Sequence, residues 1–262
     1  MNYDISSILA KWQHKSGEVT VRCITGCDGR PKIQMRLDLG LLQMEKEGRP
    51  DGGRPYGCES LLEYHLGQLE RYKQSNGVEI GFELSQEQCR ALREEAVMYY
   101  YRYLSLFIMG QYHQVIQDTK RNLDVFDLCR KFAAQEVDRL ALEQYRPYVL
   151  MMNTRARAQL AIQENKLVEA LEICREGINS IKEFFEQISR PKLAKQCSEL
   201  AILQDLCEDL RQKLPLDPGE ALHADLAKAL EREQYEKAAE LRDKLRNLNG
   251  SNSQSPPKKS DG

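Results

Sequence analysis

Two stretches of the chain match each other, and this repeat limits the possible folds more than any other feature of the sequence. Gly110–Ile116 aligns with Asn165–Leu171, with Val115 opposite Ala170, so the two copies lie 55 residues apart. Each copy belongs to an antiparallel pair of helices. The repeat therefore predicts that the middle of the chain is built from two helical hairpins.

The bounds of these hairpins follow from the apolar periodicity and from turn-forming residues. The first is expected from about residue 86 to 135, and the second from about residue 147 to 187. A further helix from Pro191 to about Lys213, with Ser189 as its N-cap, is expected to cover the end of the array.

Both copies resemble the turn and second helix of a tetratricopeptide repeat (TPR), which has the pattern Gly-x-Tyr-x-x-Ala. The second copy also has Ala158, where that family places a small residue between its paired helices. The spacing differs from the family's period of roughly 34 residues. The resemblance therefore implies a TPR-like body with longer helices.

Capping signals place two helix starts ahead of the second helix of the first hairpin. Ser60 and Glu63 form a capping-box pattern, as do Ser85 and Gln88. The first helix is expected to stop at Ser75–Gly77 and the second at about Met109. One face of the first helix is expected to carry Leu62, His65, Leu66 and Leu69.

The first 57 residues contain the only alternating pattern that is typical of β-structure. Glu18–Thr25 and Lys32–Leu41 alternate apolar and polar residues, which predicts two half-buried strands. Gly26–Gly29 between them has the composition of a hairpin turn. The alternation slips at Leu41–Leu42 beside Gly40, which suggests a bulge or a bend.

The segment Leu222–Leu248 carries two short amphipathic helical patterns. Polar residues 231–234 separate them, so they read as an antiparallel hairpin with one apolar side. Two helices of this length cannot bury a core of their own, since chains below roughly 40 residues usually need a partner.

The second half of this segment, Glu233–Leu245, resembles the UVR motif of the bacterial repair proteins UvrB and UvrC. The motif runs aromatic, Glu-x-Ala-Ala-x-x-Arg-Asp, and this chain matches it from Tyr235 to Asp243. The resemblance implies a helical hairpin that docks a partner protein, and it implies no catalytic chemistry. The residues expected to bind the partner are Leu226, Leu230, Tyr235, Ala238, Ala239, Arg242 and Asp243.

Composition excludes several classes of function. With 38 basic and 40 acidic residues the net charge is −2, which argues against direct binding to DNA. No apolar run approaches the roughly 18 residues of a membrane span, and no signal peptide is recognisable at the N-terminus. Eight scattered cysteines without a C-x-x-C pair favour a reducing compartment, so a cytoplasmic protein is expected.

No catalytic, cofactor-binding or metal-binding residue is expected. Cys23, Cys27 and Cys58 could in principle meet His14 or His65 around a metal, but C-x₃-C is a poor zinc pattern. Four scattered histidines form no recognisable catalytic arrangement. The tyrosines within 99–103 could stack nucleic-acid bases, although at helical spacing they fit a packed helix better.

A loop rich in glycine and arginine, Arg49–Arg54, is the best candidate for a small-ligand or phosphate site. The alternative is a polar connector that is braced by pairing between arginine and aspartate. The surrounding segment, Gly26–Gly57, is similar to the N-terminal region of uncharacterised bacterial proteins that end in a UVR motif. That resemblance implies no activity.

The sequence as a whole predicts a mainly α protein with a small N-terminal β-hairpin unit, a TPR-like array and a C-terminal helical hairpin. The expected domains are residues 1–57, 58–213 and 220–248, followed by a disordered tail over 249–262. The expected function is a non-enzymatic adaptor that binds another protein through residues 220–248, with homo-oligomers possible. The alternatives are an accessory factor of nucleotide-excision repair, and an enzyme or ligand sensor that uses the Arg49–Arg54 loop.

Overall fold

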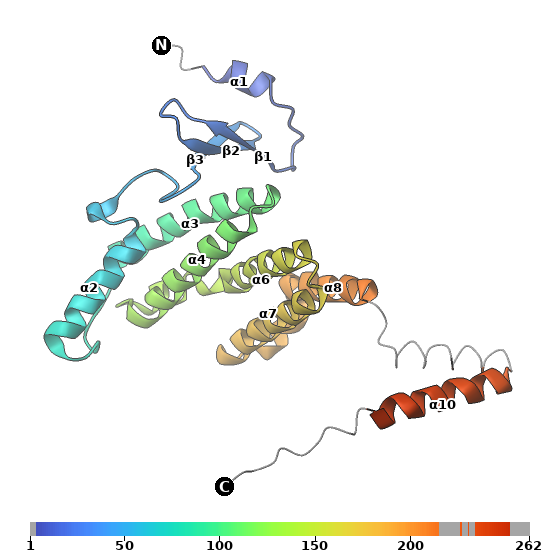
Figure 1. Cartoon of the computed structure of the whole chain (residues 1–262). Helices are drawn as coiled ribbons and strands as arrows, with labels where there is room; N and C mark the ends of the chain where they lie inside the picture. Colours follow the sequence, from blue (N-terminus) through green and yellow to red (C-terminus); the bar gives the residue numbers. More distant parts are fainter. Residues whose placement is uncertain (1–3, 215–225, 227–229, 231–233, 252–262) are drawn as a thin grey trace, which may run out of the picture. The chain divides into compact units, whose positions relative to one another are not determined.

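The computed structural model describes residues 4–214, 226, 230 and 234–251 of the chain. The chain divides into two compact units, Met1–Leu210 and Arg211–Gly262, and each is described by itself. Figure 1 shows that the described chain is mainly helical, with one small sheet near the N-terminus, as the sequence predicts. None of the helices in the described ranges combines the length and the apolar composition that crossing a bilayer requires.

The N-terminal sheet has three antiparallel strands in sequence order, where the sequence predicts two. After the short helix α1 (Ser6–Ala10) come β1 (Thr20–Thr25), β2 (Pro31–Leu37) and β3 (Gly40–Glu45). Gly26–Gly29 forms the turn between β1 and β2, as expected.

The expected strand Lys32–Leu41 is wrong, because the chain reverses in the middle of it. Leu37 pairs with Gly40, so Asp38 and Leu39 form a two-residue turn. Leu39, one of the apolar residues in that alternating pattern, is almost fully exposed. Met35 pairs with Leu42 and Ile33 with Met44, so the inward-facing residues change from odd to even positions across the turn. The pattern reads as one long strand because Leu39 and Leu41 continue the odd-numbered apolar series by sequence alone.

The central strand β2 is buried on both faces, and not half-buried as expected. Ile33 and Met35 belong to the apolar core. On the other face the Gln34 amide lies between Arg22 and Gln43, accepting from the former and donating to the latter at 2.8 Å each. On β1, Cys23 is exposed and does not share a buried face with Val21.

Two capped helices follow. Helix α2 (Leu61–Asn76) starts at Ser60, whose hydroxyl accepts from the amide of Glu63, and it ends at the left-handed Gly77. The Glu63 carboxylate accepts from the amide of Glu59 and not from that of Ser60, so only the serine half of the predicted capping box is formed. Helix α3 (Gln86–Ile108) has the complete capping box between Ser85 and Gln88.

Both predicted helical hairpins are present. The first consists of α3 and α4 (Tyr112–Phe132), and the second of α6 (Arg146–Gln163) and α7 (Leu167–Gln187). Val115 on α4 and Ala170 on α7, which the repeat aligns, are both fully buried. The relationship to TPR units stays a prediction.

The second hairpin is closely packed because its facing residues are small. A Cβ atom at Gly177 of α7 would lie 2.2 Å from the Thr154 hydroxyl of α6, so only glycine allows this approach. Ala158 of α6 is fully buried, in agreement with the predicted close contact of the paired helices.

The segment after α7 differs from the predicted single helix. A 3₁₀ helix, η3 (Pro191–Gln196), precedes α8 (Ser198–Lys213), and the two are separated at Cys197. Ser189 has a left-handed backbone with φ of 57° and caps no helix.

In the second unit, α10 (Tyr235–Ser251) begins at the predicted residue. It extends past residue 248, so the first three residues of the predicted tail are helical. Leu226 and Leu230 are also helical, in agreement with the first helix of the hairpin. The predicted linker, most of that first helix and residues 252–262 lie outside the described residues.

Candidate functional site

The predicted partner-binding residues on α10 fall into two groups. Tyr235, Ala239 and Arg242 follow the i, i+4, i+7 spacing of one helix face, and all three are exposed, Tyr235 to 68%. Leu241 lies on the neighbouring face and is only 8% exposed. The exposed face with the aromatic and the arginine is therefore free to contact a partner, whereas the leucine face is already covered.

The remaining predicted residues fit this division. Asp243 is exposed at the edge of the Tyr235–Ala239–Arg242 face, and Leu230 is half exposed. Leu226 is partly buried. Ala238 lies within α10, but its side chain is outside what the structure describes.

The second candidate region, the loop Arg49–Arg54, is held by side chains of the protein itself. The Arg49 guanidinium contacts the Asp51 carboxylate at 3.0 Å, and the other oxygen of Asp51 accepts from the amide of Gly53 at 2.9 Å. Arg49 also donates to the Glu95 carboxylate at 2.8 Å. The loop is therefore a braced connector between the sheet and α3, which favours the alternative of arginine–aspartate pairing.

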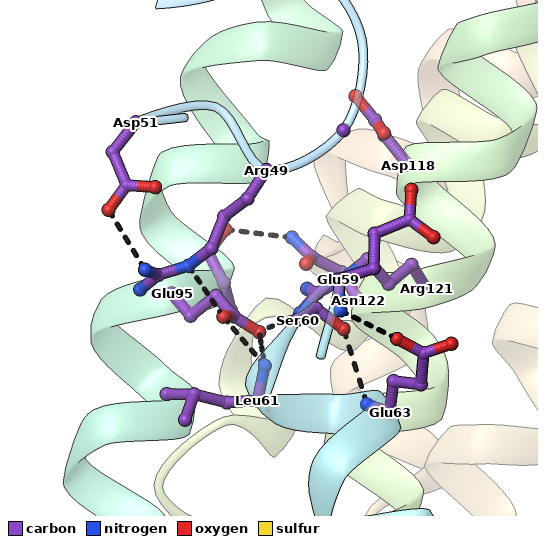
Figure 2. A network of polar contacts seen from close by, with 12 residues as sticks. Arg49, Asp51, Glu59, Ser60, Leu61, Glu63, Glu95, Asp118, Arg121 and Asn122 are labelled. Atoms are coloured by element: carbon purple, nitrogen blue, oxygen red, sulfur yellow. Dashed lines mark hydrogen bonds and ion pairs between the residues drawn. The ribbon is translucent and has the colours of Figure 1, made fainter. Parts of the chain in front are cut away.

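Glu95 is the centre of a polar network that the sequence analysis missed (Figure 2). Its side chain is fully buried and accepts from Arg49, from Arg121 of α4 and from the amide of Leu61. The Leu61 amide is one of the unpaired donors at the start of α2, and Glu95 caps it from another helix. One carboxylate thus connects the N-terminal loop, α2, α3 and α4.

A second buried ion pair lies next to this centre. Arg102 of α3 donates to both carboxylate oxygens of Asp118 on α4, at 2.8 and 2.7 Å, and also to the carbonyl of Gly48. Burial raises the pKa of Asp118, and the hydrogen bonds from Arg102 oppose that shift. This bidentate pair holds the two helices of the first hairpin in register.

Arg121 is the least well paired member of the network. Its guanidinium lies 3.6 Å from the centroid of the Tyr99 ring, and its Nε and Nη1 atoms are buried without a hydrogen-bond partner. Burial lowers the pKa of Arg121 to about 9, and the charge of Arg49 contributes to the shift. Two buried carboxylates, Glu95 and Asp118, are shared among the buried Arg102 and the partly buried Arg49 and Arg121.

A pocket of about 410 Å³ opens over this network. Ser60 and Glu63 of the α2 start, Arg102 of α3, and Asp118 and Arg121 of α4 line it. The Arg102–Asp118 ion pair forms part of its wall, so the pocket adjoins the structural network. Charged residues inside the otherwise apolar pattern of α3, at positions 95 and 102, were the signal that sequence reasoning could have used.

The cysteines and histidines considered for a metal site are scattered in the structure. Cys23 and Cys27 are exposed, and His14 bonds the Asp38 carboxylate at 2.8 Å. His65 is buried in α2. Over residues 4–214 and the described parts beyond, no three His, Cys, Asp or Glu side chains come together in a way that could hold a metal ion.

The tyrosines of α3 are packed against the body, as their helical spacing favours. Tyr99 and Tyr103 are buried, and Tyr100 and Tyr101 are half buried. Tyr100 contacts Tyr103 and Tyr148 with ring centroids 5.6 and 6.0 Å apart. The rings therefore form an internal aromatic cluster and not an open surface for stacking bases.

Comparison with known proteins finds one similarity. The family model described as the UvrB/uvrC motif, UVR, matches residues 220–251. The match lies wholly within the second unit and covers well under half of the chain. No curated protein and no solved structure matches the chain.

Proposed function

We propose that this protein is a non-enzymatic adaptor that docks a partner protein through the UVR segment, residues 220–251. The observation that carries the proposal is that this matched segment presents Tyr235 and Arg242 to solvent on one face of α10. Tyrosine and arginine are the residue types that contribute most often to the binding energy of interfaces. Ala239 between them leaves room for a partner helix to approach closely.

The remainder of the chain acts as a scaffold in this proposal. The two helical hairpins, which we interpret as TPR-like, form a body to which the N-terminal sheet is attached through the Arg49–Glu95 contact. The eight unpaired cysteines support a cytoplasmic location, where thiols stay reduced.

Affinity capture from a bacterial extract tests the proposal. The full chain is compared with a chain that lacks residues 220–251, and captured proteins are identified by mass spectrometry. We expect a partner that is captured by the full chain alone. Equal capture by both chains would contradict the proposal.

Affinity capture and one further measurement test two alternatives. Capture of UvrB or UvrC would favour an accessory role in nucleotide-excision repair. Size-exclusion chromatography with light scattering measures whether the partner is a second copy of the chain, in which case deletion of residues 220–251 would convert a dimer into a monomer.

A further inference from the structure

Four of the eight cysteines are buried, and they form two contact pairs between helices. Cys89 of α3 and Cys129 of α4 are 0% and 1% exposed, and the Cys129 thiol donates a hydrogen bond to the sulfur of Cys89. The thiols of Cys174 on α7 and Cys207 on α8 make the second contact. All four are free thiols. Because a thiol forms a disulfide with a neighbouring thiol once one of them is oxidised, each pair is a candidate for reversible oxidation.

The first pair lies at the open end of the first hairpin. Cys89 is the fourth residue of α3, and Cys129 is the fourth from the end of α4. The backbone of Leu84 closes this end, since it donates to the carbonyl of Phe132 at 2.8 Å and accepts from the amide of Ala134 at 3.0 Å. The same Leu84 carbonyl lies 4.0 Å from the sulfur of Cys89. Helix ends open locally at a lower free energy than helix centres, so a small oxidant can reach this pair without unfolding of the hairpin.

The two sulfurs of this pair differ in acidity. The hydrogen bond from Cys129 lowers the pKa of Cys89, whereas the same contact raises the pKa of Cys129. A position in the first turn of a helix also favours a thiolate. The nearest charges, Asp138 and Arg93, act on Cys89 in opposite directions and are paired with each other at 2.6 Å. Cys89 is therefore the nucleophile of the pair.

The second pair lacks both features. Cys174 and Cys207 lie near the middle of α7 and α8, away from the helix ends. Burial raises the pKa of Cys174 to about 12, so its thiol keeps its proton. Because the thiolate is the reactive form, this pair should stay reduced. It provides a comparison within the same chain.

We propose that Cys89 and Cys129 form a redox-sensitive dithiol that a hydroperoxide converts into an internal disulfide. The Cys89 thiolate attacks one oxygen of hydrogen peroxide and breaks the O–O bond, which leaves a sulfenic acid and a hydroxide that takes up a proton. The sulfur of Cys129 then attacks the sulfenic sulfur, and the S–O bond breaks as the S–S bond forms. Two thiols and one peroxide thus give one disulfide and two waters, and the two electrons that the sulfurs lose reduce the peroxide.

The product joins the start of α3 covalently to the end of α4. A disulfide of this kind in a reducing compartment is usually transient and reports oxidation. The dithiol is independent of the UVR segment, so it stands whether or not the adaptor function does.

Peptide mapping of the oxidised full chain tests the proposal. The chain is treated with hydrogen peroxide, the remaining thiols are alkylated in urea, and the chain is digested without reduction for mass spectrometry. We expect a linked pair of peptides that contain Cys89 and Cys129, and dithiothreitol should separate them. Linkage of Cys174 to Cys207 should be slower by about tenfold or more, since that pair lacks a reactive thiolate.

Two serine variants separate the roles of the two sulfurs. Cys129→Ser keeps a hydrogen-bond donor beside Cys89 but cannot close the disulfide, so Cys89 should stop at the sulfenic acid, which dimedone traps. In Cys89→Ser, Cys129 should stay reduced under the same conditions. Circular dichroism checks that both variants are folded. The proposal is overturned if no linked Cys89–Cys129 peptides form in the wild type, if Cys174 and Cys207 link at the same rate, or if folded Cys89→Ser oxidises at Cys129 as fast as the wild type forms its disulfide.

Discussion

Glu95 accepts a hydrogen bond of 2.8 Å from Arg49, although the two residues lie 46 positions apart in the chain. The contact joins the loop after the N-terminal sheet to the first long helix of the body. Arg49 of the glycine-rich loop therefore binds a buried carboxylate of the same molecule (Figure 2).

Loss of this carboxylate should destabilise the whole first unit. Glu95→Ala leaves Arg49, Arg121 and the Leu61 amide without their shared acceptor. Removal of one partner from a buried ion pair costs about 3–5 kcal/mol of unfolding free energy. Glu94→Ala, on the exposed side of the same helix, should change it by less than about 0.5 kcal/mol. Urea denaturation measures both, and equal stability of the two variants would refute the structural role of the network.

The helical repeat predicts a second difference in stability. Ala170→Glu would bury an unpaired charge between α6 and α7, so the body should lose several kcal/mol or fail to fold. Val168→Glu, two residues earlier and exposed, should melt within a few degrees of the wild type. Circular dichroism at 222 nm follows the melting, and an unchanged melting temperature for Ala170→Glu would contradict the packing.

The proposed docking face predicts a loss of binding without a loss of stability. Tyr235→Ala and Arg242→Glu should each abolish partner capture, because both side chains are exposed and stabilise little within the chain. The melting temperature of the body should not change. Glu240→Ala, exposed on another face of α10, is the control and should leave capture intact. Normal capture by Tyr235→Ala would remove the basis of the adaptor proposal.

His65 predicts a pH dependence of stability. Burial lowers the pKa of His65 below its ordinary 6.5. Between the pKa of His65 in the folded chain and 6.5, the unfolded chain binds a proton that the folded chain does not. The contribution of neutral His65 to the free energy of unfolding is therefore complete above pH 6.5 and falls as the pH drops below that value. His65→Leu should weaken this decline, whereas His113→Gln, at an exposed position, should retain it. Urea denaturation at pH 7 and pH 5 measures the free energy of unfolding of each variant. An equal loss of this free energy in the wild type and in His65→Leu would disprove the role of His65.

Direct binding to DNA should be weak. With a net charge of −2, duplex DNA should bind no more tightly than the non-specific range of about 10⁻⁴ to 10⁻⁶ M at physiological salt. Fluorescence anisotropy measures the affinity. A nanomolar Kd that weakens steeply with salt would instead support a repair factor that contacts DNA itself.

Features that depend on neighbouring residues could be predicted from the sequence. The capping box at Ser85 and Gln88 and the left-handed Gly77 close hydrogen bonds within a few residues, so local composition is enough to place them. The pairing of α3 with α4 and of α6 with α7 followed from the repeat, because small and apolar residues at helical spacing must be buried against a nearby helix. The start of α10 at Tyr235 followed from the polar residues 231–234, which separate the two helical patterns.

Other features were decided only by the tertiary structure. The turn at Asp38–Leu39 was missed because Leu39 and Leu41 continue the odd-numbered apolar series of β2, although the inward-facing residues of β3 are the even-numbered ones. Glu95 and Arg102 look like solvated helix residues in the sequence, and only the packing of α3 on α4 shows that they are buried. The sequence by itself determined the starts of α2 and α3 and the two helical hairpins of the body. The tertiary structure decided which charges are buried, since burial depends on residues far away in the chain that local patterns do not contain.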